Sequence, residues 1–367
     1  GSPFSPSADG TLAEPGRIVG DYSGWGAYVN LDFAVTDTLD LSLGLRYTDD
    51  EKDFAINVPT PTSELGAYWA YGFTTAGFVK DTQSWDDLTP RVIVKWHPTD
   101  ERMFFASYTA GFKSGGFGSF ALNDPNGAPA GFQDPQNVDA TNAAGFRPNA
   151  FGEETIDSIE LGYKDTLFDG RTNVELTAFF YNYEDLQVVI NTVTGAGQVG
   201  NVGDVEAQGL EGSVTTALGD NFTLYLAVGW LDSEATELQT ICGLEDVNGC
   251  EGTSLFWAPD VSGAVVLNGD FPIEGGEIRS SLEAFWESER GGGWESLPET
   301  EIDSYVEMAL RVGYHSDDNW HVDAYVENLT DEFTWDGQNN NSGIIPSHFF
   351  GPKRPRTFGL RFGFSWE

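Results

Sequence analysis

Few residues in this 367-residue sequence have the types and spacing that catalysis or metal binding requires. The four histidines, His97, His315, His321 and His348, show no ligand spacing such as His-Glu-x-x-His. We expect His97 and His315 to lie in solvated turns. No serine stands in the Gly-x-Ser-x-Gly context of a nucleophile elbow. The sequence therefore predicts a protein that is not an enzyme and has neither a catalytic site nor a metal centre.

The two cysteines are the remaining candidates for covalent chemistry. Cys242 and Cys250 lie eight residues apart in a Gly-rich polar segment, and no second pair or nearby histidine suggests a metal site. In an oxidising compartment they would form a disulfide across a loop. In the chain-entropy model such a short loop gains roughly 2–3 kcal/mol.

The pattern of the C-terminal residues indicates which elements the chain is built from. Phe358, Leu360, Phe362, Phe364 and Trp366 alternate with small or polar residues, which is the period of a β-strand. The pattern recurs about thirteen times in segments near ten residues long, the length that a tilted strand needs to cross a bilayer. No stretch approaches 18 consecutive apolar residues, which excludes a helical membrane protein. The sequence predicts an all-β, transmembrane antiparallel β-barrel.

The spacing of the expected strands sorts the connections into two kinds. Strands are expected at about 23–36, 39–48, 85–97, 104–113, 154–167, 171–189, 203–217, 221–235, 258–269, 277–289, 302–314, 319–330 and 354–366. Short turns near 37, 99, 169, 219, 273 and 316 alternate with long loops near 70, 135, 195, 245, 295 and 342. In outer-membrane barrels the short turns are periplasmic and the long loops extracellular.

An odd number of strands is unusual, because every strand edge in lipid must be paired. The last strand would run toward the periplasm, and so would the first. We therefore expect residues 1–22 to be the end of an extracellular loop and residues 23–367 to be the C-terminal part of a larger barrel.

The charge balance bears on partners. The chain has 58 acidic and 18 basic residues, a net charge of −40, which repels nucleic acid and excludes it as a partner. Two interpretations remain open: solvated loops with a polar lumen, or calcium binding in acidic extracellular loops. Asp246-Val247-Asn248-Gly249 has only part of a calcium-loop pattern.

Several stretches resemble the barrel of TonB-dependent outer-membrane receptors, and they occur in the family's order. They are Leu43–Lys52, Ala106–Phe117, Glu153–Thr155 with Glu160–Lys164, Phe179–Gln187, Asn201–Gly203 with Gly209–Glu211, Glu327–Asp331 and Pro355–Leu360. The resemblance implies a barrel of about 22 strands around a plug domain, of which this chain would supply the last thirteen without the plug.

The resemblance also implies function and partners. It suggests a bacterial outer-membrane receptor for active uptake of a scarce nutrient, such as a ferric siderophore in iron uptake. The implied partners are the N-terminal strands and plug of the same receptor, the TonB complex through that plug with its TonB box, and outer-membrane lipid and lipopolysaccharide. By this resemblance, we expect the plug, the TonB-contacting segment and about nine strands to be missing from the sequence considered.

Two groups of residues are candidates for contacts. Extracellular aromatic residues could bind ligand by stacking: Tyr68, Trp69, Tyr71, Phe117, Phe132, Trp294, Trp335, Phe349 and Phe350. Charged residues that alternate with the outward apolar set would face the lumen and could contact a plug: Arg46, Glu160, Glu307 and Arg311. Basic residues are sparse in the loops, which favours an uncharged ligand over a strongly anionic one.

Two other functions stay open at this stage. A passive porin or hydrophobic-substrate channel would share the barrel but have no plug. A soluble, secreted β-rich binding protein would bury the apolar face in a core.

Overall fold

The computed structural model describes residues 16–58, 75, 77–123, 129–130, 145–191, 197–238, 252–255, 257–291, 301–340 and 348–366. These residues form strands, turns and loops. They include no helix that is long and apolar enough to cross a membrane.

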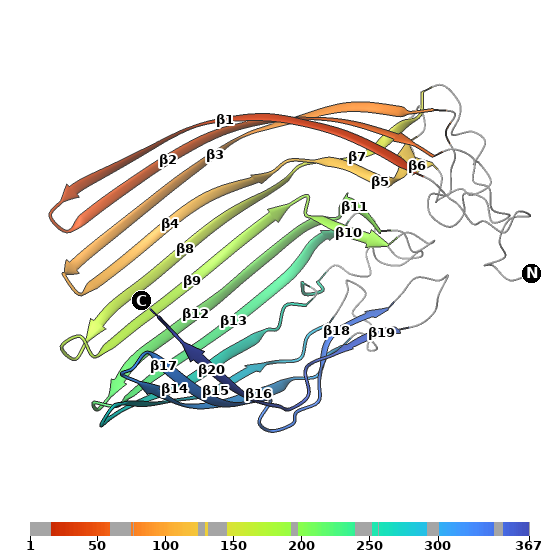
Figure 1. Cartoon of the computed structure of the whole chain (residues 1–367). Helices are drawn as coiled ribbons and strands as arrows, with labels where there is room; N and C mark the ends of the chain where they lie inside the picture. The colour runs from red at the N-terminus through yellow and green to blue at the C-terminus, as the bar shows by residue number, and fades with distance from the viewer. Residues whose placement is uncertain are drawn as a thin grey trace, which may run out of the picture.

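One antiparallel sheet of thirteen strands dominates the structure, and its strands lie side by side in chain order (Figure 1). In this order they are β1 (Arg17–Thr36), β2 (Leu39–Asn57), β3 (Val79–Thr99), β4 (Arg102–Lys113), β8 (Glu154–Leu167), β9 (Thr172–Glu184), β12 (Gly203–Leu218), β13 (Phe222–Leu238), β14 (Val261–Ile273), β15 (Gly276–Glu287), β16 (Tyr305–Ser316), β17 (Trp320–Glu327) and β20 (Thr357–Phe364). The sheet is strongly curved, but among the described residues its end strands β1 and β20 do not pair, so the barrel is not closed. The all-β fold and the thirteen strands are confirmed.

Short and long connections lie at opposite ends of the sheet, as the sequence predicts. Six tight turns, at 37–38, 100–101, 168–171, 219–221, 274–275 and 317–319, lie at one end of the sheet (Figure 1). Backbone conformation explains why some of these turns are short, since Gly275 and Asn319 have φ angles of 83° and 63°. The longer connections lie at the other end, which is called the rim below.

Several strands are longer than the sequence predicts. β1 begins at Arg17 and not at 23, because its register with β2 continues as far as Asn57. The strands β2, β3 and β13 likewise extend toward the rim. Residues 17–22, expected at the end of a loop, are therefore part of the wall.

The rim also contains strands that the sequence analysis did not predict. A small sheet is formed by β5 (Gly116–Asn123), β6 (Pro129–Ala130) and β7 (Arg147–Phe151), within a segment expected to be a loop. Two hairpins, β10 (Gln187–Asn191) with β11 (Gly197–Asn201) and β18 (Trp335–Asn340) with β19 (His348–Pro352), lie in other long connections.

The register separates the two faces of the main sheet. On one face Leu31 lies opposite Leu43, Leu43 opposite Val92, and Val92 opposite Tyr108. This outer face continues to β20, where Leu360 and Phe362 are 78% and 70% exposed. Large apolar side chains exposed along a whole sheet are not typical of a soluble protein. Polar side chains occupy the alternate positions, on the inner face.

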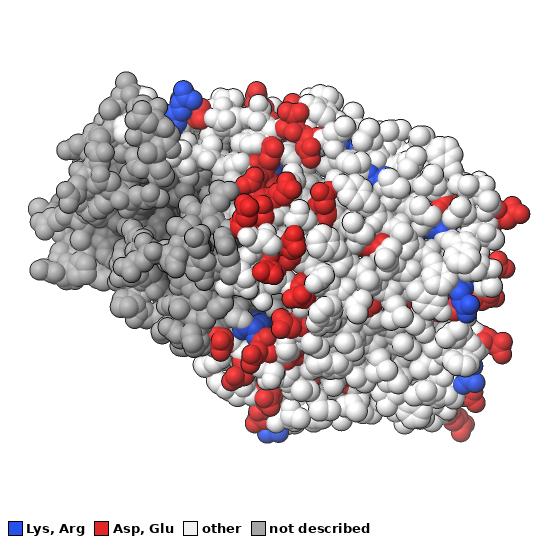
Figure 2. Space-filling model, turned by 180° about the vertical axis from the view of Figure 1, so that it is seen from behind, with Lys and Arg blue, Asp and Glu red and all other residues white. Residues whose placement is uncertain are grey.

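Acidic residues gather on the outer face in a band next to the rim, as Figure 2 shows from behind. The register assigns to this carboxylate belt Asp49, Glu51, Asp53, Asp86, Asp157, Glu184, Glu206, Asp232 and Glu234. Tyr47 and Tyr108, just below the belt, donate hydrogen bonds to Asp86 and Asp157 at 3.2 and 2.6 Å. On these strands, the apolar part of the outer face therefore ends at carboxylates, two of which accept hydrogen bonds from tyrosines.

Buried apolar clusters occur at the rim. One joins Phe54, Ile56 and Val58 at the end of β2 to Leu122 of β5. The other contains Val202, Val205 and Ala235. These clusters fix the rim strands to the wall.

Candidate functional site: the inner face and rim

The four inner-face residues predicted to face a plug lie on the same side of the sheet but on separate strands. Arg46 is on β2, Glu160 on β8, and Glu307 and Arg311 on β16. Arg46 Nε donates to Thr48 Oγ1 at 3.0 Å, and Tyr181 Oη donates to Glu160 at 3.1 Å. The structure brings them onto one face without joining them in a single site.

Stretches that carry the family resemblance meet at the rim. Gln187 is nearly buried, and its side-chain amide donates to the carbonyls of Lys113, Ser114 and Gly152 at 3.3, 3.2 and 2.9 Å. Lys52, at the end of another such stretch, donates to Ser114 Oγ at 2.9 Å and to the Gly115 carbonyl. These motifs therefore hold the β4–β5 corner in place.

Asn201 likewise binds backbone carbonyls of neighbouring rim segments through its side chain. Its side-chain amide donates to the carbonyls of Gly152, Glu153 and Asp185 at 3.3, 3.0 and 2.7 Å. Burial raises the pKa of the nearby Glu153 carboxyl, and the carboxylates of Asp87, Asp86 and Asp185 raise it further. In this part of the rim, side-chain hydrogen bonds hold the backbone, and several carboxylates lie close to one another.

Of the aromatic residues predicted to bind ligand, Phe117 and Trp335 have described side chains and the others do not. Phe117 stacks on Phe54 with ring centroids 5.1 Å apart and meets Trp85 edge-on at 6.4 Å, so its ring packs within a rim cluster. Trp335 packs edge-on against Phe333 at 5.1 Å. Tyr68, Trp69, Tyr71, Phe132, Trp294, and the side chains of Phe349 and Phe350 lie outside the described residues, as do Cys242 and Cys250.

Two histidines that the sequence placed apart are brought together at the turn end of the inner face. His315 and His321 are direct partners across β16 and β17, with parallel rings 4.9 Å apart. The carboxylate of Asp323, a residue that is only 7% exposed, contacts both: one oxygen lies 3.1 Å from Nε2 of His315 and the other lies 3.8 Å from Nε2 of His321. Gly313 and Gly363 leave the space that these side chains fill.

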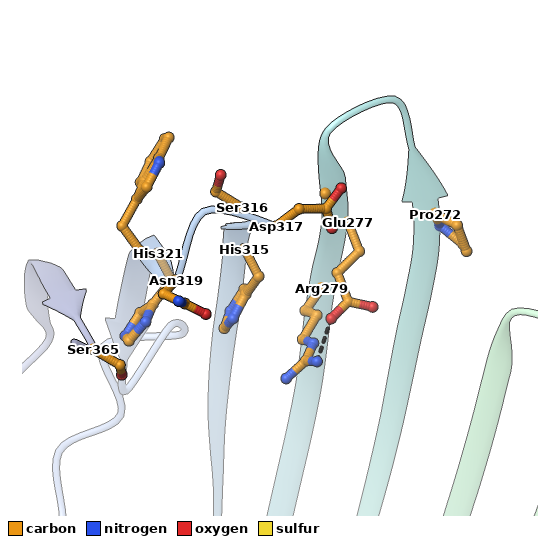
Figure 3. A pocket seen from close by; sticks show the side chains of 11 residues that line it. Pro272, Glu277, Arg279, His315, Ser316, Asp317, Asn319, His321 and Ser365 are labelled. Carbon is orange, nitrogen blue, oxygen red and sulfur yellow. Dashed lines mark hydrogen bonds and ion pairs between the residues drawn. The ribbon is translucent and has the colours of Figure 1, made fainter. Parts of the chain in front are cut away.

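Around this pair lies a polar recess of about 500 Å³ (Figure 3). Glu277 and Arg279 of β15, Asp317 and Asn319 of the turn, and Ser365 also line it, and Glu277 and Arg279 form an ion pair. The side chain of His97 is exposed, as expected for a histidine near a turn, and it also contacts Asp40 at 3.4 Å; the contact of His315 with Asp323 was not predicted. The near-symmetric placement of His315 and His321 about the 317–319 turn was the available signal for their pairing.

A curved antiparallel wall with an apolar outer face, a polar inner face and its long loops at one end defines the class of outer-membrane β-barrels. Within that class, the chain belongs to the TonB-dependent receptor-like β-barrel family, whose model matches residues 2–329. This family consists of outer-membrane receptors and transporters and not of enzymes. The resemblance read from the sequence is confirmed.

Solved structures share this fold. The ferric yersiniabactin uptake receptor FyuA from Yersinia pestis is 15% identical with a TM-score of 0.72, and the alignment covers 94% of this chain and 46% of that one. The siderophore receptor PiuA from Acinetobacter baumannii is 17% identical with a TM-score of 0.68, covering 95% and 44%. The unliganded ferric citrate transporter FecA is 16% identical with a TM-score of 0.62, covering 97% and 46%.

The chain thus spans less than half the length of these structures. Among curated protein sequences, none matches it.

Proposed function

We propose that this chain forms part of the barrel of a TonB-dependent receptor that takes up a scarce nutrient, such as a ferric siderophore, across the bacterial outer membrane. The observation that carries the proposal is the register, which puts apolar side chains on one face and polar ones on the other across all thirteen strands of a wall of this family. The siderophore receptors among its structural neighbours support the ligand class.

The partners that we propose follow from the unpaired edges of the sheet and from its outer face. Each backbone group left unpaired in hydrocarbon costs on the order of several kcal/mol, so the edges at β1 and β20 require further strands. We expect those strands and a plug to belong to the same receptor, with TonB acting on the plug. Outer-membrane lipid and lipopolysaccharide would surround the outer face, with calcium screening the acidic loops and the carboxylate belt.

Uptake by cells tests this function. Cells lacking the protein should lose growth on one ferric chelate under iron limitation, and restoring the gene should restore growth. Because an energised receptor depends on TonB, deleting TonB should abolish the same uptake. Uptake that continues without TonB would favour the passive channel, and recovery of the protein in a detergent-free soluble fraction would exclude both barrel functions.

A further inference from the structure

Three side chains of types that bind metal ions lie together at the turn end of the inner face. His315 on β16 and His321 on β17 are direct cross-strand partners, and Asp323 follows His321 by two residues, so it lies on the same face. The backbone register therefore brings all three together. Local ligand spacing did not indicate a metal centre here, because the two histidines belong to different strands.

The donor atoms of these side chains have the spacing that a metal ion requires. Nε2 of His315 lies 3.1 Å from one oxygen of Asp323, and Nε2 of His321 lies 3.8 Å from the other. Two ligands that hold a tetrahedral ion at about 2.0–2.1 Å are roughly 3.3–3.4 Å apart. The longer of the two distances also exceeds that of a hydrogen bond, so a shared proton does not join His321 to the carboxylate.

A small rotation of one side chain would complete the site. Among the described residues, no group of three such side chains already surrounds one point. In this cluster the two rings are parallel, with centroids 4.9 Å apart, so their nitrogen lone pairs do not converge. The side chain of His321 is 34% exposed and has room to turn toward Asp323.

Two glycines provide the space that the cluster occupies. The carboxylate of Asp323 lies where a side chain on Gly313 would project, and the ring of His321 lies where one on Gly363 would. Both glycines are the cross-strand partners of the residues that they accommodate. Although Arg361 is also directly opposite Asp323, the carboxylate contacts the two imidazoles.

The charges around the cluster allow a divalent cation to bind. Glu277, the partner of His315 on β15, and Asp317 of the turn line the adjoining recess of about 500 Å³ (Figure 3). Arg279 also lines the recess, but its ion pair with Glu277 offsets its charge. Arg361 is exposed, so solvent screens its charge. The recess leaves room for water at coordination positions that the protein does not fill.

We propose that His315, His321 and Asp323 bind a divalent transition-metal ion, for which Zn²⁺ is the probe. Two imidazoles and one carboxylate suit zinc, copper or nickel, whereas calcium and magnesium prefer oxygen ligands alone. A bound ion would fasten β16 to β17 beside the C-terminal strand β20. All three ligands belong to this chain, so the site does not depend on the proposed uptake function.

Zinc titration of the untagged protein purified from outer membranes tests the site. The protein is stripped of metal with a chelator and titrated calorimetrically in excess magnesium, which occupies sites made of carboxylates alone. We expect His315→Gln and His321→Gln each to weaken zinc binding by about 100-fold or more, since loss of an outer-shell partner alone costs about 10–100-fold. The matched control is His97→Gln, which removes a histidine that contacts a single carboxylate, Asp40, and should bind zinc like the unmodified protein.

A chemical measurement on the unmodified protein covers the case in which a variant fails to fold. Diethyl pyrocarbonate acylates accessible imidazole nitrogens, and bound zinc should protect His315 and His321 from it while His97 stays reactive. Peptide mass spectrometry gives the extent of modification at each histidine. Zinc affinity that is unchanged in both His315→Gln and His321→Gln, or equal modification of these two histidines with and without zinc, would overturn the proposal.

Discussion

At the scale of single residues, two side-chain amides fix the rim. Gln187 and Asn201 together donate to the backbone carbonyls of Lys113, Ser114, Gly152, Glu153 and Asp185. Backbone groups near a buried cluster must find partners, and irregular segments cannot supply them from a sheet ladder. The side-chain amides of Gln187 and Asn201 supply hydrogen-bond donors to these carbonyls in place of a neighbouring strand.

Replacing Gln187 by alanine should therefore weaken the rim. The change removes the donors to three carbonyls from a nearly buried position, and we expect a loss of about 1–3 kcal/mol in unfolding free energy. The matched control is Gln208→Ala, whose exposed side chain makes one bond to Asp232 at 3.0 Å. Thermal melts in detergent in which both variants lose the same stability would show that the carbonyls of the β4–β5 corner do not depend on Gln187.

Glu153 gives a prediction with a defined pH dependence. Burial and three neighbouring carboxylates raise the pKa of its carboxyl in the folded state, so ionisation of Glu153 opposes folding. Glu153→Gln should raise the unfolding midpoint at neutral pH. The gain should shrink as pH falls through the raised pKa, because the native side chain then becomes neutral as well.

Melts of both proteins between pH 4 and pH 8 check this sign. The backbone carbonyl that accepts from Asn201 is retained in the variant, so the comparison isolates the side-chain charge. A gain that is constant with pH would mean that the carboxylate charge is not the cause.

At the scale of elements, the alternation of side chains decides which substitutions a strand tolerates. On β13, Leu226 is on the outer face opposite Val214 and Val265, whereas Tyr225 is on the inner face opposite Thr215 and Val266. A lysine on a lipid-facing position near the middle of the membrane costs about 2–4 kcal/mol, and a lumen position carries no such cost.

We expect Leu226→Lys to reduce assembly in the outer membrane and Tyr225→Lys to be tolerated. The two variants place the same charge on adjacent residues, so they differ only in face. Quantifying folded protein in outer-membrane fractions by its resistance to heat and detergent checks the difference. Equal loss in both variants would contradict the assignment of faces.

The strands of the main sheet were predictable because a period of two survives wherever one face meets lipid and the other meets water. The rim strands were not. The segment that forms β5 to β7 is rich in Gly, Pro and Ala and lacks that alternation, and β9 ends where Asp185 adopts a φ of 54°. These short strands are stabilised by contacts with the wall, such as the cluster around Leu122. A local sequence pattern does not reveal such contacts.

For the inner face, the sequence predicted which residues face inward but not how they pair. Arg46 and Arg311 were placed correctly on that face, whereas the capture of Asp323 by two histidines depends on the register of three strands. Phe117 packs on Phe54, a contact that a linear pattern does not reveal, and its contact with a ligand stays a prediction.

At the scale of the whole molecule, the open edges of the sheet give the last prediction. β1 pairs with β2 and β20 with β17, and the described residues show no pairing between β1 and β20. Edges exposed to hydrocarbon are prohibitively costly, so we expect other strands to lie between them in the membrane. Val29→Cys on β1 and Leu360→Cys on β20, both outward-facing, should not form a disulfide with each other under oxidation in intact outer membranes. Val29→Cys with Leu45→Cys, which are direct partners on β1 and β2, provides the positive control for crosslinking. A crosslink between β1 and β20 would instead mean that the thirteen strands close on themselves, and it would favour the passive channel.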